Sequence, residues 1–256
     1  MCSTLTIRWL SWQFKTLCKK LKKGKIHLTP VKMTDTVLDC RLPGLLRLVI
    51  SGPSESGKTS FLFRFILQGE HILQRPFKKV YFFYHNEQPL YDELRAVLGS
   101  DIEFLEGNPN DSAVERIVQR QKNSELPFLI CMDDFSQSLN KEVATLFTRI
   151  SHHHKAHLIL LIHNIYNRSP FTREITQSAN ALCLFKNPRD MSIATVLGKQ
   201  LMPKNSGIFA SIYKEATKRP YGYLFVNFHQ GAHEDLRYLS NLLIEDWPIR
   251  VFIPEI

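Results

Sequence analysis

The segment Gly52–Thr59 reads GPSESGKT, with two glycines separated by four residues and followed by lysine and threonine. The apolar run Leu48–Ile50 precedes it, and a stretch of helical period, Ser60–Leu67, follows it. Glycines let backbone N–H groups turn inward around phosphate oxygens, and the start of the next helix adds the positive end of its dipole. The pattern G-x4-G-K-[ST] in this context predicts a phosphate-binding loop, the Walker A motif.

The spacing within this loop assigns chemical roles. We expect the Lys58 ammonium to contact the β- and γ-phosphates of ATP, and the Thr59 hydroxyl to be a ligand of Mg²⁺. Glu55 is expected to face solvent and receives no chemical role. The predicted nucleotide-binding residues are Gly52, Pro53, Ser54, Glu55, Ser56, Gly57, Lys58, Thr59 and Ser60.

A second motif, FLICMDDF at Phe128–Phe135, is an apolar run that ends in two carboxylates. Metal and ligand sites in open α/β sheets form at the carboxyl ends of strands. We expect Asp133 to hold Mg²⁺, directly or through water, and Asp134 to polarise the attacking water. Acidic residues after a strand also serve as caps or turn formers. Together with the upstream phosphate loop, however, this pair predicts a Walker B motif.

From Leu45 onward, short apolar runs alternate with stretches of helical period. Continuous apolar strands separated by helices are typical of a mostly parallel sheet covered on both faces, an α/β fold. The expected strands are Leu45–Ile50, Lys79–Tyr84, Ile102–Leu105, Phe128–Met132, Leu158–Ile162, Ala181–Phe185, Tyr223–Phe228 and Arg250–Ile253. The expected helical stretches include Thr59–Gln68, Ser112–Lys122 and Lys141–His152.

The spacing between the two motifs narrows the class of P-loop NTPase. Between the loop and Asp133 the chain has room for the apolar strand Lys79–Tyr84 and further α/β material. An extra strand between the Walker A and Walker B strands is typical of ring-forming motor ATPases, whereas small nucleotide kinases place those strands side by side. An additional-strand P-loop fold is therefore expected.

Composition excludes several other classes. The chain has 256 residues, 44% hydrophobic and 22% charged, which argues against intrinsic disorder. No apolar run approaches the ~18–20 residues that span a bilayer, so stable membrane insertion is not expected. The five cysteines are odd in number, widely spaced and never arranged as CxxC. This disfavours a disulfide framework, a zinc ribbon and secretion, and favours a reducing compartment.

Basic charge is concentrated at the N-terminus. Residues 1–34 contain eight basic side chains and no acidic one, so the rest of the chain is nearly neutral, with 25 basic (33 − 8) against 24 acidic residues. We therefore divide the chain into a basic arm, 1–34, and an ATPase domain, 35–256. The arm has one apolar helical stripe and the lysine-rich run Lys19–Lys25. It fits a membrane-surface helix, an import signal, a DNA or partner contact, or a solvated tail.

From about Leu45 to Ile256 the chain resembles the genome-packaging ATPases of Polinton (Maverick) elements and adintovirus-type DNA viruses. These belong to the FtsK–HerA superfamily, as does the poxvirus packaging ATPase. The segments that carry the resemblance are GPSESGKT, CMDDF, LFTRISHHHKAHLILLIHN, LFKNPRD and YGYLFVNFHQ. The resemblance implies a homo-oligomeric ring that translocates double-stranded DNA into capsids, with capsid proteins as partners and the host nucleus or the virion as its location.

The resemblance also extends to single residues. Lys58 and Thr59 match the family's Walker A, and Asp133 and Asp134 its Walker B, where relatives often have Glu in place of Asp134. His163, in the tripeptide IHN, stands where the family commonly has the glutamine of TQN, which senses the γ-phosphate. A neutral imidazole also donates a hydrogen bond. His163 is therefore expected to keep the sensor role, with an impaired copy as the alternative.

Charge on the γ-phosphate in the transition state usually calls for an arginine, often from a neighbouring subunit. Arg149, Arg173 and Arg189 are candidates, and we select Arg189 because it follows the Ala181–Phe185 strand near the expected subunit edge. A surface ion pair is the ordinary alternative for each. The run His152–His154 is not expected to bind metal, because adjacent side chains on a helix point in different directions.

Three other functions stay open. A helicase or replication motor shares the same ATP site. A domesticated scaffold that binds nucleotide without hydrolysing it is favoured only by His163. A nucleotide kinase fits least, because the sequence has no obvious lid or base-recognition signature.

Overall fold

The structure is a computed structural model that describes residues 39–135, 139–150, 154–167 and 169–254. The chain divides into two units, Met1–Asp39 and Cys40–Ile256, and the sheet with its covering helices belongs to the second. The basic arm, His152 and His153 lie outside the described residues. Within the described ranges, no helix combines the length and the apolar character needed to cross a membrane.

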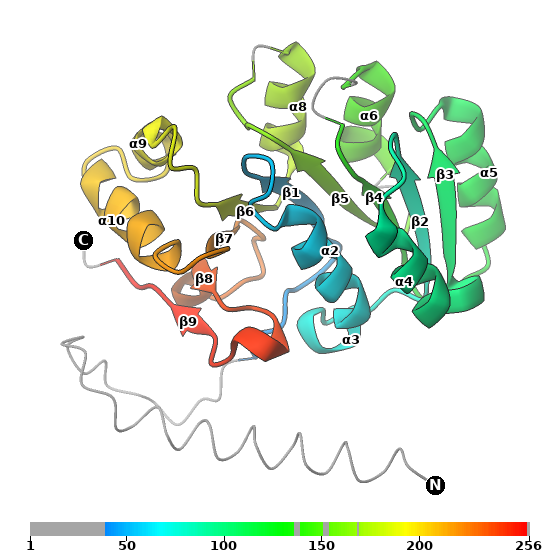
Figure 1. Cartoon of the computed structure of the whole chain (residues 1–256), viewed down its shortest axis with the longest axis horizontal. Helices are drawn as coiled ribbons and strands as arrows, with labels where there is room; N and C mark the ends of the chain where they lie inside the picture. Colours follow the sequence, from blue (N-terminus) through cyan, green and yellow to red (C-terminus); the bar gives the residue numbers. More distant parts are fainter. Residues whose placement is uncertain (1–38, 136–138, 151–153, 168, 255–256) are drawn as a thin grey trace, which may run out of the picture. The chain divides into compact units, whose positions relative to one another are not determined.

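The described residues form one nine-stranded sheet in the order β3-β2-β4-β5-β1-β6-β7-β8-β9 (Figure 1). The strands from β3 to β6 in that order are parallel, and β7, β8 and β9 continue the sheet antiparallel. The strands are β1 Arg47–Ser51, β2 Lys79–Tyr84, β3 Ile102–Glu106, β4 Phe128–Met132, β5 Ala156–Ile162, β6 Ala181–Phe185, β7 Tyr223–Asn227, β8 Tyr238–Ser240 and β9 Arg250–Val251. The predicted mostly parallel α/β sheet is therefore confirmed.

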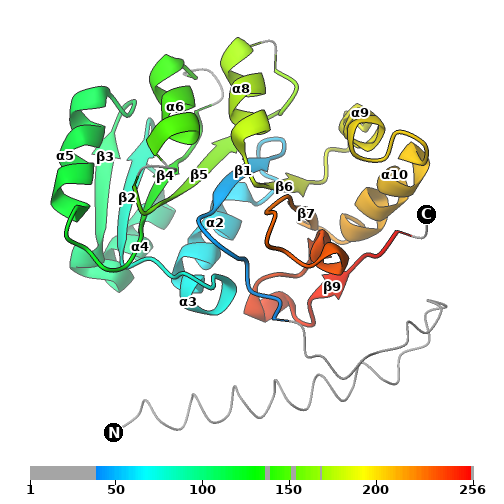
Figure 2. The same ribbon diagram turned by 180° about the vertical axis from the view of Figure 1, so that it is seen from behind.

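Helices cover both faces of this sheet (Figures 1 and 2). The α-helices are α2 Lys58–Leu67, α3 Gly69–Ile72, α4 Pro89–Leu98, α5 Asp111–Gln121, α6 Lys141–Thr145, α8 Pro170–Ser178, α9 Ser192–Leu201 and α10 Ser206–Ala216. The short helical turns are η1 Gly99–Asp101, η2 Leu146–Ile150, η3 Glu234–Leu236 and η4 Ile244–Asp246. η2 is a π-helical turn, so the helix expected over Lys141–His152 is α-helical only to Thr145.

Two apolar cores lie on opposite faces because strand side chains alternate in direction. In β4, Ile130 and Met132 join one core, packed by α5, α6, α8, α9 and α10. Leu129 and Cys131 join the other, packed by α2, α3 and α4. Each residue of β4 is buried, which explains why its sequence is an uninterrupted apolar run.

The strand between the two motif strands is β5, which pairs with β4 on one side and with β1 on the other. The additional strand is thus present, but it follows the Walker B strand in the sequence. The strand Lys79–Tyr84, expected from its position between the motifs, is β2 and lies beyond β4. Apolar periodicity marks a strand but does not give its lateral order, because every central strand is buried alike.

Candidate nucleotide-binding site

The loop between β1 and α2 needs glycine at two positions. Gly57, the residue before α2, has φ of 94°, a backbone conformation that residues with a side chain rarely adopt. A Cβ at Gly52 would lie 2.7 Å from both the Phe185 Cβ and the Ser56 Oγ. The backbone therefore curls tightly at the start of α2, a shape that suits a phosphate-binding loop.

Lys58 is held at the centre of this loop. Its Nζ donates hydrogen bonds to the carbonyl oxygens of Gly52 and Pro53, each at 2.8 Å. Burial lowers the pKa of the Lys58 ammonium, while the carboxylates of Asp133 and Asp134 raise it. A partly desolvated ammonium on an inward-curled loop attracts an anion, so the arrangement suits a polyphosphate.

Glu55 and Ser56 belong to the loop, and Ser51 is the last residue of β1. Glu55 is exposed, as expected, and adopts φ of 62°. The hydroxyl oxygens of Ser51 and Ser56 are buried and have no hydrogen-bond partner within the part of the chain that the structure describes. Buried hydroxyl groups usually find a partner, so both are suited to contact a bound polar group.

The Asp133 carboxylate lies next to the Thr59 hydroxyl at the end of β4. The Thr59 Oγ1 is 3.5 Å from Asp133 Oδ1, and the Tyr91 hydroxyl donates to Asp133 Oδ2 at 2.9 Å. Asp133 is 3% exposed, and burial raises the pKa of its carboxyl, with the bonds from Tyr91 and Thr59 lowering it in part. Mg²⁺ prefers oxygen ligands such as this carboxylate, and its charge would offset the free-energy cost of burying the carboxylate.

Asp134 and His163 follow neighbouring strands and meet at the same edge of the sheet. His163 Nε2 lies 3.3 Å from Asp134 Oδ1, and both side chains are nearly half exposed. Asp134 has φ of 60°, which is left-handed and costs free energy for a residue other than glycine. This conformation separates the directions of Asp133 and Asp134, leaving one carboxylate buried and the other open to water.

Tyr91 is the site residue that the sequence did not predict. It lies in the first turn of α4, which starts at Pro89, and it is buried. It precedes Asp133 by 42 positions. A tyrosine at an apolar helix position is most often a core residue, so no local sequence signal distinguishes it.

The three candidate arginines are exposed and lie in different elements of the fold. Arg149 is in η2, Arg173 in α8, and Arg189 in the turn after β6. The turn of Arg189 is fixed, because the Tyr213 hydroxyl donates to the Phe185 carbonyl at 2.8 Å and accepts from the Asn187 N–H at 3.2 Å. Within the described residues, no ion pair of the Arg189 side chain is found. Its role stays a prediction.

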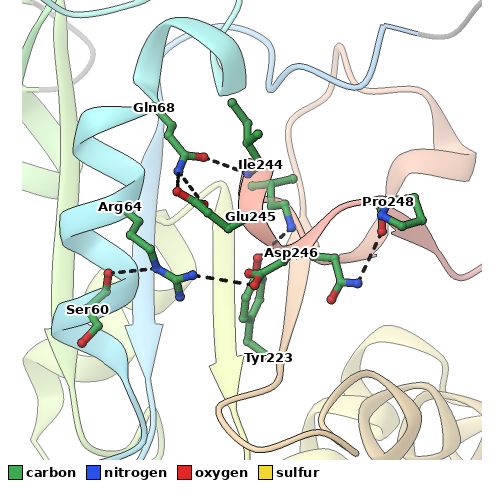
Figure 3. A network of polar contacts seen from close by, with 10 residues as sticks. Ser60, Arg64, Gln68, Tyr223, Ile244, Glu245, Asp246 and Pro248 are labelled. Carbon is green, nitrogen blue, oxygen red and sulfur yellow. Dashed lines mark hydrogen bonds and ion pairs between the residues drawn. The ribbon is translucent and has the colours of Figure 1, made fainter. Parts of the chain in front are cut away.

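The C-terminal part of the chain holds helix α2, which carries Lys58 and Thr59 (Figure 3). The Gln68 side chain, at the end of α2, donates to the Glu245 carboxylate at 2.7 Å and accepts from the Ile244 N–H at 2.9 Å. Arg64 lies 3.7 Å from Asp246. On the sheet side, Phe61 packs edge-on against Tyr223 with ring centroids 4.8 Å apart. The loop therefore rests on a helix that is fixed at several points along its length.

No protein-family model and no curated protein matches the chain. Among solved structures, B204, the DNA-packaging ATPase of Sulfolobus turreted icosahedral virus, has a TM-score of 0.47 and 16% identity over 81% of this chain and 97% of that one. The genome-packaging NTPase B204 of Sulfolobus turreted icosahedral virus 2, in complex with sulfate, has a TM-score of 0.47 and 14% identity over 83% of this chain and 98% of that one. The cytoplasmic domain of EssC has a TM-score of 0.40 and 13% identity over 65% of this chain and 36% of that one. Scores at this level assign no activity, so function has to be inferred from the chain's own site.

Proposed function

We propose that this chain is a Mg²⁺-dependent ATPase that forms a homo-oligomeric ring and translocates double-stranded DNA to package a viral or virus-like genome into capsids. The observation that carries the ATPase is the meeting of Thr59 and Asp133, 3.5 Å apart, beside the loop-bound Lys58. An inward-curled loop, a partly buried cation and a buried carboxylate together suit a metal-bound nucleoside triphosphate.

Each residue then has a role in hydrolysis. Backbone N–H groups of the loop and the Lys58 ammonium bind the phosphates. Thr59 and Asp133 would hold Mg²⁺, which would supply positive charge to neutralise the triphosphate. Asp134, open to water, orients the attacking water and accepts its proton. His163 contacts Asp134 and helps to aim it at that water. The remaining charge on the γ-phosphate is stabilised by Arg189 of a neighbouring subunit.

The DNA-packaging part of the proposal is supported by the motifs that resemble the packaging ATPases, above all LFKNPRD and YGYLFVNFHQ. It implies capsid proteins as partners and the host nucleus or the virion as the location. A helicase would use the same ATP site, so the choice between the two depends on whether ATP hydrolysis separates strands.

The test is ATP hydrolysis by the purified chain with and without duplex DNA. Lys58→Ala is expected to abolish nucleotide binding, because Lys58 is the main positive charge of the loop. Asp134→Asn should still bind ATP but hydrolyse it at least ~100-fold more slowly. Lys199→Ala, an exposed lysine of α9, is the matched control and should behave as wild type.

Unchanged ATP affinity in Lys58→Ala would exclude the loop as the nucleotide site. Hydrolysis that duplex DNA does not stimulate would contradict a DNA motor. Nucleotide binding with no hydrolysis would favour a nucleotide-binding scaffold. ATP-dependent strand separation would favour a helicase instead.

A further inference from the structure

Tyr221 is a large aromatic residue in an unusual environment. It is 68% exposed, and its φ is 57°, in the left-handed region that favours glycine. Exposing a tyrosine ring and holding its backbone in this region both cost free energy. A residue held in this way is a candidate for a functional contact.

The Tyr221 side chain lies against the phosphate loop. A Cβ added at Gly57 would be 3.3 Å from Tyr221 Cδ1 and 3.6 Å from its Cβ. Glycine at position 57 therefore serves two purposes, since it permits the φ of 94° and leaves room for the ring. The ring thus lies beside the residue that precedes α2, with most of its surface in solvent.

The turn that carries Tyr221 is tightly fixed. The Gly222 N–H donates to the Arg219 carbonyl at 3.0 Å, and the Lys186 N–H donates to the Gly222 carbonyl at 3.4 Å. A Cβ at Gly222 would be only 2.9 Å from two carbonyl oxygens, those of Ala216 and Arg219. The ring is therefore placed by the backbone and not by a mobile loop.

The strand order gives the direction in which a nucleotide lies across the loop. Asp133 follows β4 and His163 follows β5, so the groups expected at the γ-phosphate lie on one side of β1. On the other side of β1 are β6 and then β7, and Tyr221 lies two residues before the start of β7. With its γ-phosphate towards Asp133, a triphosphate extends its nucleoside towards β6 and β7.

We propose that the Tyr221 ring is the stacking surface for the nucleobase of the bound nucleoside triphosphate. The inference rests on the proposed nucleotide site and adds to it the group that holds the base. An exposed ring beside the loop, on the nucleoside side, offers a flat apolar face to an aromatic base. Stacking on an aromatic side chain accepts any base, because every base has a π-face.

The test compares a nucleotide with a ligand that has phosphates but no base. Binding of the Mg²⁺ complexes of AMP-PNP and of tripolyphosphate is measured by calorimetry for wild type, Tyr221→Ala, Tyr221→Leu and Tyr221→Phe. Tyr221→Ala and Tyr221→Leu should weaken AMP-PNP binding roughly 5- to 150-fold, the range for losing a base–aromatic stack, and leave tripolyphosphate binding unchanged. Tyr221→Phe, which keeps the ring, should bind both ligands as wild type does.

Other results would contradict either the role of Tyr221 or the proposed nucleotide site. If AMP-PNP binding is unchanged in Tyr221→Ala and Tyr221→Leu, or if both ligands weaken together, Tyr221 does not hold the base. If Tyr221→Leu binds AMP-PNP as wild type does, apolar contact without a ring suffices and stacking is excluded. If wild type binds neither ligand, the proposed nucleotide site itself fails. Unfolding curves of the variants establish that they remain folded.

Discussion

Asp133 is the residue at which burial and charge conflict most in the site. The carboxylate is almost fully buried, so its charged form has lost most of its hydration. The hydroxyl groups of Tyr91 and Thr59 replace part of that hydration, and the Lys58 charge also favours the ionised form. A carboxylate desolvated to this degree is favourable only with a cation nearby. Of these neighbours, Tyr91 has no proposed contact with the nucleotide or with Mg²⁺, so it acts on the site through Asp133.

Tyr91→Phe tests the effect of the Tyr91 hydroxyl on Asp133 by removing a single oxygen atom. Loss of the hydroxyl removes the donor 2.9 Å from Asp133 Oδ2 and leaves the packing of the ring in place. We expect the apparent Mg²⁺ affinity, measured as the Mg²⁺ dependence of ATP hydrolysis, to fall about 10-fold or more, the usual effect of removing such a partner from a metal ligand. Thr59 then remains as the neighbouring hydroxyl.

Tyr81→Phe is the matched control for Tyr91→Phe. Tyr81 is equally buried, and its hydroxyl accepts from Gln121 Nε2 at 2.9 Å. It should change the stability of the fold without changing the Mg²⁺ dependence. Equal Mg²⁺ dependence in wild type and Tyr91→Phe would mean that the bond to Asp133 is structural only.

At the residue scale, the sequence indicates the side chains whose spacing is fixed by local backbone geometry. Lys58 and Thr59 follow directly from the loop, and Asp133 from the end of an apolar strand. Tyr91 was not predictable, because its contact with Asp133 depends on how α4 packs over β2 and β4. His163 was predicted by resemblance, but its contact with Asp134 follows from the pairing of β4 with β5.

At the scale of elements, His157 joins β5 to two other segments. Its Nδ1 accepts from the Leu46 N–H at 3.0 Å, just before β1, so its Nε2 carries the proton and donates to the Arg75 carbonyl at 2.8 Å. The side chain is fully buried. Burial lowers the pKa of His157 to about 4, although the bond to Arg75 opposes the shift.

This shift predicts a pH dependence of stability. Below its pKa near 6.5, the histidine of the unfolded chain binds a proton, whereas the folded histidine stays neutral until the pH approaches 4. The contribution of the neutral His157 to the free energy of unfolding is therefore complete above pH 6.5 and is lost as the pH falls towards 4. The loss should reach about 3 kcal/mol of the free energy of unfolding, at up to ~1.4 kcal/mol per pH unit. Urea unfolding at pH 7, 6 and 5 measures it.

His157→Gln separates this contribution from those of the carboxyl groups, which titrate mainly at lower pH. Glutamine keeps a donor and an acceptor but does not titrate. The variant should be less stable than wild type at pH 7, and the difference should narrow as pH falls to 5. A constant difference between the two proteins over this range would contradict the assignment of the buried neutral histidine.

The elements themselves were predictable to different degrees. β2, β4 and β6 have their expected bounds because each is a short run made almost entirely of apolar and aromatic residues. β8 was not predicted, since three residues give too little periodicity to recognise a strand. The end of the α-helix at Thr145 was not predicted either, because the change to a π-helical turn at Leu146 leaves the apolar spacing almost unchanged.

At the scale of the whole molecule, the site lacks a defined cation for the far side of the γ-phosphate among the residues that the structure describes. Lys58 is bound within the loop, and Asp133, Asp134 and His163 bring two carboxyl groups and an imidazole. The turn of Arg189 lies at the carboxyl end of β6, next to β1, and is fixed by Tyr213 while its arginine is exposed. An exposed arginine on a fixed turn suits the site of an adjacent subunit in a ring.

A mixing experiment tests whether the arginine acts between subunits. Arg189→Ala subunits keep an intact phosphate loop, and Lys58→Ala subunits keep an intact arginine, so each alone should be nearly inactive, because a trans arginine contributes ~10³–10⁵ in rate. In an equal mixture that assembles at random, roughly a quarter of the interfaces pair an intact loop with an intact arginine, and ATP hydrolysis should recover accordingly. Arg173→Ala, an exposed arginine of α8, is the control and should be active alone. No recovery at any mixing ratio, together with full activity of dilute wild-type monomers, would mean that the site is complete within one chain and that Arg189 has no role in hydrolysis.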